Sequence, residues 1–253
     1  MSGNTVVGTS WKMNLTSNDA RAYLSDLVPL LADATDREIF VLPPFTSIWV
    51  AREVLAGTPI GWGAQDVHEA GAGAHTGDIS AAMLVDIGCR YVEIGHSERR
   101  RGHGEIDQRI AAKVRAALQA GLTPILCVGE SSRFASHVAR SAVVRQLGRS
   151  LAGVRGPDLD RVIVAYEPVW AIGEGASAAP LDHVAGVHAA IAASLRRMGA
   201  GRPRVVYGGS VDTSNAGCLL DLPEVDGLFV GRAALDPRTF STIAQTPLER
   251  RHP

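Results

Sequence analysis

A carboxylate stands where an apolar segment of this chain gives way to a loop. Residues 162–165 are apolar, Tyr166 and Glu167 follow them, and Pro168 comes next, before a loop that contains Gly173 and Gly175. A carboxylate at the mouth of a buried strand, beneath a loop that closes over it, is partly desolvated, which raises its pKa. Such a group takes a proton from carbon more readily. The pattern predicts that Glu167 is a general base.

A lysine and a histidine follow two other apolar segments in the same way. Lys12 comes after residues 5–10, and His96 ends the run of residues 91–96. Of the 25 basic residues only Lys12 and Lys113 are lysines, so the chain uses arginine for nearly all its positive charge. A lysine at position 12 therefore indicates a role that a planar guanidinium cannot fill, such as a contact between a compact ammonium and a substrate oxygen. We expect His96 to donate a hydrogen bond to a carbonyl. A short helix that begins near Glu98 would favour its neutral form.

Glycine-rich segments near the C-terminus complete this chemistry. Gly208, Gly209 and Ser210 follow one apolar run, and Gly231 and Arg232 follow the next. Backbone N–H groups in such segments face anions, so they predict a phosphate site, to which Gly173 adds another N–H group. Together these groups indicate proton abstraction next to a carbonyl on a phosphorylated substrate. An enediol intermediate would lose phosphate in water, which requires a lid. Residues 168–170 would form its hinge and residues 171–175 its tip.

Eight β-branched runs position these residues and alternate with segments of helical periodicity. Alternation of this kind predicts parallel pairing and right-handed crossovers. Eight such units in 253 residues predict an α/β fold, a closed (β/α)8 barrel of eight parallel strands with outer helices, formed by a single domain over residues 1–253. The active site of a barrel lies at the carboxyl ends of its strands, where these polar residues fall. The predicted strands are residues 5–10, 38–43, 59–66, 91–97, 123–130, 162–168, 203–210 and 227–233.

The bulk composition excludes several classes of partner. A formal net charge of −1 gives no electrostatic reason to expect a nucleic acid or a membrane as partner. No apolar stretch reaches the roughly 20 residues that span a bilayer, and the first residues do not form a secretory signal. The three cysteines form neither a disulfide framework nor a zinc pattern. We therefore expect a cytoplasmic protein.

The motifs that carry these residues resemble the triosephosphate isomerase family. They run in order along nearly the whole chain: residues 11–14 (WKMN), 64–66 (AQD), 76–80 (TGDIS), 95–100 (GHSERR), 127–130 (CVGE), 165–173 (AYEPVWAIG) and 207–211 (YGGSV), followed by the region of Gly231. The resemblance implies an isomerase of carbohydrate metabolism, in glycolysis and gluconeogenesis. It would interconvert dihydroxyacetone phosphate and glyceraldehyde 3-phosphate through an enediol. No metal and no organic cofactor is implied.

The resemblance also implies roles for individual residues. Glu167 would be the base, His96 the electrophile and Lys12 the cation at the carbonyl, while Glu98 would pair with Lys12 or help to shuttle protons. The family is usually a homodimer, in which the third loop, here residues 71–79, enters the partner and brings Thr76 near Lys12. The implied phosphate ligands are Gly173, Gly209, Ser210 and Gly231, and the implied lid residues are Pro168, Trp170, Glu174, Gly175 and Ala176.

Departures from the family pattern cluster at the substrate contacts. Ser10 stands where the family usually has Asn, Arg232 replaces a Gly, and Glu174 and Ala176 alter the lid. Arg232 restricts the backbone or adds a charged contact to phosphate. The extra room at Ser10 keeps open a second activity, the isomerisation of a four-carbon ketose phosphate (L-erythrulose 1-phosphate to D-erythrulose 4-phosphate) by the same chemistry. A remote third alternative is a non-catalytic phosphate-binding barrel, although such a module needs no base.

Overall fold

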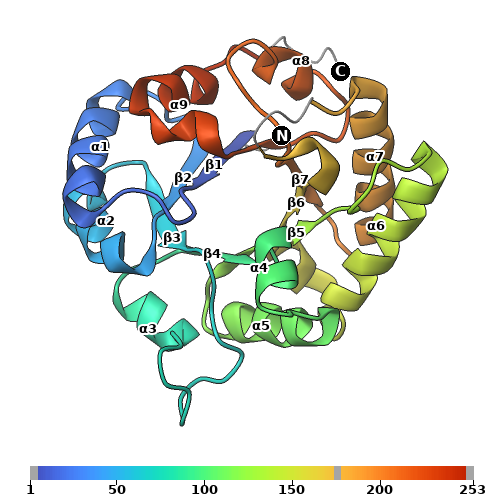
Figure 1. Cartoon of the computed structure of the whole chain (residues 1–253), viewed down its shortest axis with the longest axis horizontal. Helices are drawn as coiled ribbons and strands as arrows, with labels where there is room; N and C mark the ends of the chain where they lie inside the picture. The colour runs from blue at the N-terminus through green and yellow to red at the C-terminus, as the bar shows by residue number, and fades with distance from the viewer. Residues whose placement is uncertain (1–4, 174–177, 249–253) are drawn as a thin grey trace.

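Eight parallel strands close into a barrel in the computed structural model, which describes residues 5–173 and 178–248 (Figure 1). Each strand pairs with the next along the chain, and β8 pairs with β1 to complete the ring. This topology confirms the predicted (β/α)8 barrel. The strands are β1 (Thr5–Ser10), β2 (Arg37–Leu42), β3 (Gly61–Ala64), β4 (Tyr91–Ile94), β5 (Thr123–Val128), β6 (Ile163–Tyr166), β7 (Arg204–Tyr207) and β8 (Gly227–Val230).

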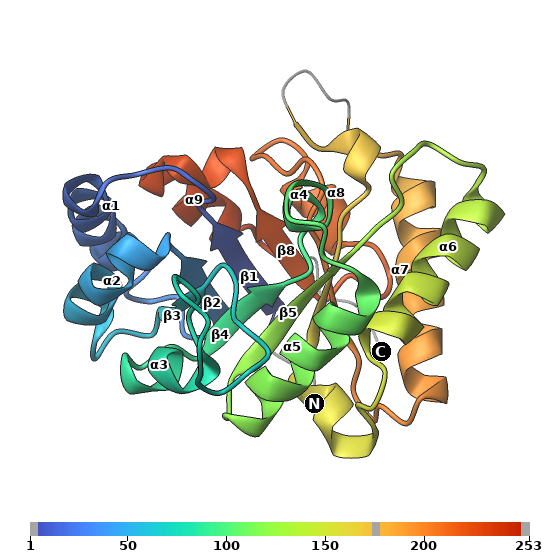
Figure 2. The same cartoon turned by 60° about the horizontal axis from the view of Figure 1, so that its bottom comes forward.

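The helices lie outside the ring of strands (Figures 1 and 2). In α1, Leu24 and Leu27 lie on one face and are fully buried, as helical periodicity predicts. None of the helices in the described ranges is long and apolar enough to span a bilayer. The helices are α1 (Ser17–Leu30), α2 (Ile48–Leu55), α3 (Ala81–Asp86), α4 (Ser97–Gly102), α5 (Asp107–Gln119), α6 (Ser136–Ser150), α7 (Leu181–Arg197), α8 (Ala216–Leu220) and α9 (Pro237–Ala244), with 3₁₀ turns η1 (Phe45–Ser47), η2 (Gly156–Arg161), η3 (Val169–Ala171) and η4 (Arg232–Leu235).

The side chains of each strand alternate between two cores. On β4, Val92 and Ile94 pack toward the helices, whereas Tyr91 packs inside the barrel and Glu93, two residues further on, points the same way. Ten apolar side chains form the core inside the barrel, so a carboxylate next to them stands out. The apolar interior residues are Val6, Phe40, Leu42, Tyr91, Ile125, Cys127, Ile163, Ala165, Val206 and Phe229.

Glycines allow neighbouring strands to approach at two critical points. A Cβ atom at Gly227 would lie 1.8 Å from the carbonyl oxygen of Val6, where β8 meets β1. A Cβ atom at Gly129 would lie 1.8 Å from the carbonyl oxygen of Glu167. Closing the barrel and seating the end of β6 therefore both require a residue without a side chain.

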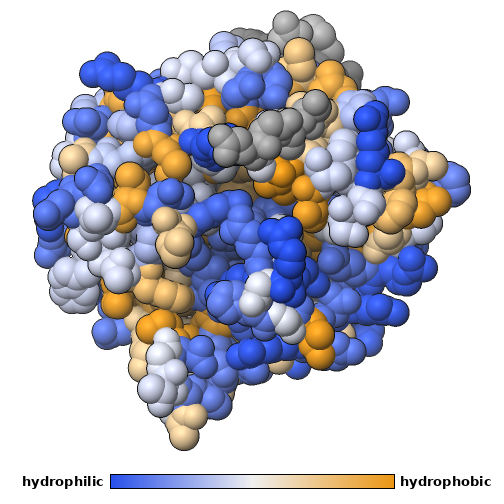
Figure 3. Space-filling model, in the orientation of Figure 1, coloured by the Kyte–Doolittle hydropathy of each residue, from blue (hydrophilic) through white to orange (hydrophobic). Residues whose placement is uncertain are grey.

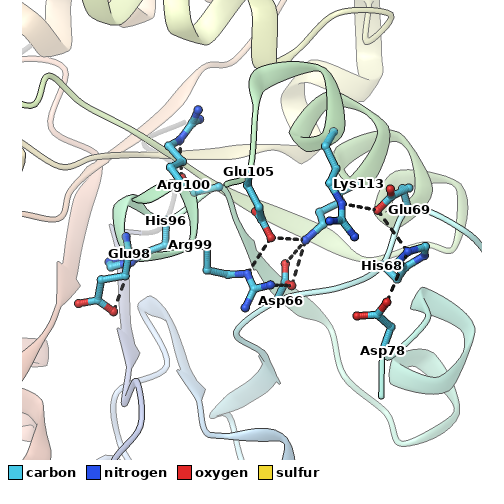
Figure 4. Close-up of polar contacts among 12 residues, drawn as sticks. Asp66, His68, Glu69, Asp78, His96, Glu98, Arg99, Arg100, Glu105 and Lys113 are labelled. Atoms are coloured by element: carbon cyan, nitrogen blue, oxygen red, sulfur yellow. Dashed lines mark hydrogen bonds and ion pairs between the residues drawn. The ribbon is translucent and has the colours of Figure 1, made fainter. Parts of the chain in front are cut away.

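A buried charge network fixes α4 to the barrel (Figure 4). The Lys113 ammonium lies 2.7 Å from Asp66 Oδ1 and 2.6 Å from Glu105 Oε1. The Arg99 guanidinium, on α4, contacts the same two carboxylates at 2.7 and 2.8 Å. Two cations and two anions therefore compensate one another, and α4 is tied to the loop after β3 and to the segment before α5. Arg100 adds hydrogen bonds to the carbonyl of Gly95.

We expect Lys113→Met to destabilise the protein strongly. The Lys113 side chain is 1% exposed, so its loss leaves the carboxylates of Asp66 and Glu105 undercompensated, at a cost of about 3–5 kcal/mol in the free energy of unfolding. Urea denaturation followed by circular dichroism measures this change. The matched control is Arg21→Met, which breaks an exposed ion pair with Glu53 and should cost less than about 1 kcal/mol. Equal losses of unfolding free energy in Lys113→Met and Arg21→Met would contradict a stabilising role for the buried charge network.

Candidate active site

A cavity of about 1140 Å³ opens at the carboxyl ends of the strands. The face that carries it is hydrophilic around its hollowed centre (Figure 3). The cavity brings together residues from the ends of strands that lie far apart in the sequence, as a barrel rim should. The sequence-predicted residues that line it are Ser10, Lys12, His96, Glu98, Glu167, Gly173, Gly209, Ser210, Gly231 and Arg232.

Glu167 stands at the end of β6 with its side chain buried. Its backbone N–H donates to the carbonyl of Val128 at 2.8 Å, and a Cβ atom at Gly208 would crowd its Cγ at 2.9 Å, so the glycine makes room for it. The residue is 3% exposed, and its Oε2 atom makes no hydrogen bond with the described residues. Burial raises the pKa of Glu167, opposed by the charges of His96 and Lys12. An unbonded carboxylate oxygen of raised pKa is well suited to accept a proton.

His96 faces Glu167 and caps α4. Its Nε2 atom lies 3.5 Å from Glu167 Oε2, while its Nδ1 atom accepts a hydrogen bond from the backbone N–H of Glu98 at 3.2 Å. The predicted short helix after His96 is present as α4. Burial opposes charge on the ring, but the carboxylates of Glu167 and Glu93 outweigh it and raise the pKa of His96. Because the backbone N–H of Glu98 donates to Nδ1, that atom acts as an acceptor and carries no proton. The neutral ring therefore carries its proton on Nε2, the atom that faces the cavity.

Lys12 is held in position by two contacts. Its ammonium lies 2.7 Å from Glu98 Oε1, and this hydrogen bond lowers the pKa of Glu98 against the opposing effect of partial burial. Lys12 has a φ of 54°, an unfavourable backbone conformation for a residue with a side chain. The Gln65 amide donates to the Lys12 carbonyl at 3.0 Å and to the Leu42 carbonyl at 2.9 Å, which holds the strained backbone in place.

The opposite wall of the cavity consists of the segments after β7 and β8. Gly209 and Ser210 lie after β7, and Gly231 precedes η4, whose first residue is Arg232. Arg232 is exposed and lines the cavity, so its guanidinium is available to a bound anion. A Cβ atom at Gly209 would lie 2.2 Å from the Tyr207 hydroxyl, so this position also needs a glycine.

The base of the predicted lid is anchored by a buried carboxylate. Trp170, in η3, donates from its indole Nε1 to Glu130 Oε1 at 2.7 Å, and the backbone N–H of Val169 donates to the Glu130 carbonyl at 3.0 Å. Tyr166 also donates to Glu130, at 3.0 Å. Pro168 precedes this turn and fixes its entry. The predicted lid residues Glu174, Gly175 and Ala176 lie outside the described residues.

Glu93 is a cavity residue that the sequence analysis did not identify. Ser10 donates from its Oγ atom to Glu93 Oε2 at 2.7 Å, inside the barrel. The hydroxyl of Ser10 is therefore engaged with a neighbouring strand, besides lining the cavity. The available signal was a single acidic residue within the apolar run of β4, since a charge in a barrel interior requires a partner. Cys127 is buried beside it, and burial raises the pKa of its thiol.

Thr76 is not part of this cavity. It is exposed, in the segment between β3 and α3 that projects from the body of the molecule (Figure 1). Its predicted proximity to Lys12 concerns the Lys12 of a second copy of the chain.

Known proteins with this arrangement match over almost the full chain. The family model described as triosephosphate isomerase matches residues 5–247. The triosephosphate isomerase of Thermus thermophilus is 47% identical over 243 residues, which cover 94% of this chain and 96% of the relative. That of Symbiobacterium thermophilum is 44% identical over 250 residues, 97% and 98% of the two chains.

A solved structure agrees with the sequence matches. The crystal structure of triosephosphate isomerase from Bartonella henselae superposes with a TM-score of 0.83 at 35% identity, and the match covers 95% of this chain and 97% of that one. Nothing in the comparisons favours the four-carbon substrate. On the combined grounds of fold, site geometry and sequence, this chain is an isomerase that belongs to the triosephosphate isomerase family.

Proposed function

We propose that this chain interconverts dihydroxyacetone phosphate and glyceraldehyde 3-phosphate. The observation that carries the proposal is the placement of Glu167: a buried carboxylate with an unbonded Oε2, 3.5 Å from His96 Nε2, in a cavity that Lys12 also lines. The names of the relatives support the same substrate pair. A non-catalytic phosphate-binding barrel has no use for this opposed carboxylate and imidazole.

The proposed reaction moves one proton between two neighbouring carbons. Glu167 takes the proton from the carbon next to the carbonyl, and the Nε2–H of His96 donates a hydrogen bond to the oxygen on which negative charge develops. The Lys12 ammonium stabilises the same charge, and Glu98 holds that ammonium in place. Glu167 then returns the proton to the other carbon. The former carbonyl oxygen takes a proton by way of His96 Nε2, and the neighbouring hydroxyl gives one up and becomes the new carbonyl. One C–H and one O–H bond break and one of each forms, so the isomerisation involves no net change in oxidation state.

The phosphate group of the substrate fits the opposite wall of the cavity. Backbone N–H groups after β7 and β8, at Gly209 and Gly231, and the hydroxyl of Ser210 are suited to accept it. Gly173, at the end of the described lid segment, borders the same space. Arg232 adds a positive charge, and its guanidinium forms no ion pair with a carboxylate among residues 5–173 and 178–248. This wall anchors the substrate while the reacting carbons lie between Glu167 and His96.

We expect Glu167→Asp to reduce kcat on dihydroxyacetone phosphate by about 10²–10⁴-fold, with a much smaller change in KM, because the shortened side chain draws the base away from the carbon. Coupled spectrophotometric assays of both variants and of the wild type measure this. The control is Glu53→Gln, an exposed carboxylate remote from the cavity, which should retain wild-type kinetics. Full turnover by Glu167→Asp would exclude Glu167 as the base, and a wild type that binds triose phosphate without turnover would make the chain a binding protein.

A homodimer is the second element of the proposal. Apolar side chains are exposed after each of the first three strands, among them Met13 (97% exposed), Phe45, Met83 and Val85. These strands are neighbours in the barrel, so the exposed groups lie on one side of the molecule, around the projecting loop of residues 71–79. The ring of His75, in that loop, lies 4.0 Å from the ring of His68, just before the loop, and this contact helps to give the loop a defined shape. An apolar surface around a shaped protrusion is suited to a second copy of the chain.

Thr76→Arg should convert the dimer to a monomer, because a charged side chain at the tip of the loop cannot be buried without a partner. Light scattering coupled to size exclusion should show the molar mass falling from twice 26.7 kDa to 26.7 kDa. Thr35→Arg, an equally exposed threonine just before β2, at the opposite end of the barrel, serves as the control and should leave the mass unchanged. A mass that is unchanged in Thr76→Arg would remove this loop from the interface.

A further inference from the structure

The cavity contains a second buried carboxylate that the proposed reaction does not use. Glu93 is the third residue of β4 and points into the barrel, where Tyr91 packs two residues earlier. It is 3% exposed, as is Glu167, and it lines the same cavity. Apolar side chains, among them Tyr91 and Cys127, form the hydrophobic core inside the barrel. A carboxylate in this position needs a reason, because burial of a charged group is costly.

Neutral donors hold the Glu93 carboxylate. Ser10 donates to Oε2 at 2.7 Å, and the Cys127 thiol donates to Oε1 at 3.7 Å. None of the ion pairs formed among residues 5–173 and 178–248 includes Glu93. Its carboxylate is therefore oriented by hydrogen bonds and not by an ion pair among these residues. It also acts on the His96 ring, whose pKa it helps to raise. Ser10, one of the positions at which the chain departs from the family pattern, supplies the shorter of these hydrogen bonds.

The two buried carboxylates are close to each other. An oxygen of Glu93, the sulfur of Cys127 and an oxygen of Glu167 all lie within 4.8 Å of one another. Two carboxylates at this separation in a water-poor site oppose each other's ionisation. The negative charge of one therefore increases the affinity of the other for a proton.

We propose that Glu93 is a positioning residue that acts through Glu167: its fixed negative charge strengthens Glu167 as a base, and Ser10 fixes that charge at the required distance. The inference rests on the proposed function, since it concerns the same proton transfer. The first step of the reaction transfers a proton from carbon to Glu167. A nearby negative charge that raises the proton affinity of Glu167 therefore increases the driving force for this step.

The other groups that face Glu167 act in both directions. The His96 ring and the Lys12 ammonium favour its ionised form, whereas burial and Glu93 raise the pKa of Glu167. Cys127 is neutral beside both carboxylates because burial raises the pKa of its thiol. Glu98 is bound to Lys12 and lies on the far side of His96 from Glu167. Glu93 is thus the nearby anion that offsets the effects of the Lys12 ammonium and the His96 ring on Glu167.

Glu93→Gln tests the proposal because glutamine keeps the shape and can accept the Ser10 hydrogen bond but carries no charge. We expect the acid limb of the pH profile of kcat/KM to move to lower pH by roughly one unit or more, because a base of lower pKa stays ionised to lower pH. The plateau of kcat at neutral pH should fall several-fold, since the weaker base removes the proton more slowly. Glu93→Asp retains a charge and should keep the acid limb near its wild-type position.

A titration without substrate separates this inference from the proposed function. Carbon-13 NMR of protein labelled at the glutamate side-chain carboxyl carbon follows the ionisation of Glu167, whose signal is assigned by its loss in Glu167→Gln. The Glu167 titration midpoint should be lower in Glu93→Gln than in the wild type, whether or not the protein turns over triose phosphate. If the midpoint is lower in Glu93→Gln but the wild type is inactive on triose phosphate, the proposed function alone is overturned.

Two results would overturn the inference. One is a Glu167 midpoint that is the same in wild type and Glu93→Gln. The other is a raised KM with an unmoved acid limb, which would make Glu93 a direct substrate contact. If Glu93→Gln does not fold, Ser10→Ala replaces it: loss of the 2.7 Å hydrogen bond frees the Glu93 carboxylate, and the Glu167 midpoint must then differ from the wild type.

Discussion

Closure of the strand ring is the constraint on which the rest of this molecule depends. β8 meets β1 only because Gly227 has no side chain where the carbonyl of Val6 approaches, and Gly63 similarly admits the carbonyl of Tyr91, which would lie 2.1 Å from a Cβ atom there. A closed ring of parallel strands directs every carboxyl end to one rim. Side chains separated by more than 150 residues, such as Lys12 and Glu167, then line one cavity without any local sequence signal that brings them together.

At the rim of the barrel, ion pairs and hydrogen bonds hold the side chains of the cavity in position. Arg99 and Lys113 tie α4 to the barrel, and the backbone N–H of Glu98 in α4 then orients the imidazole of His96. Glu98, on the same helix, holds Lys12. A short helix of six residues thereby orients two of the three chemical groups, while the third, Glu167, is seated by the glycine at position 129. The buried network of α4 thus contributes to function through position as much as to stability.

Period and spacing in the sequence are sufficient to predict the barrel and the rim residues, because strand ends in such a fold carry the chemistry. Pairings across the barrel were less accessible. The Ser10–Glu93 hydrogen bond joins two residues that are 83 positions apart in the sequence. The residues next to Glu93 in its apolar run do not indicate this partner. Gln65 stands out in the sequence only as part of the motif of residues 64–66, because its support of the Lys12 backbone depends on the φ of Lys12. Burial of Lys113 likewise follows from helix packing that helical periodicity does not resolve.

The scarcity of lysine has a practical consequence for chemical modification. Arginine supplies nearly all the positive charge of this chain, and its two lysines differ sharply in access: the side chain of Lys113 is sealed within its ion pairs, whereas that of Lys12 is 32% exposed in the cavity. Apart from the α-amino group, a reagent specific for primary amines therefore meets one accessible target on the folded protein. Acylating or reductively alkylating probes would label the catalytic cavity selectively, and a bound phosphorylated ligand would shield it.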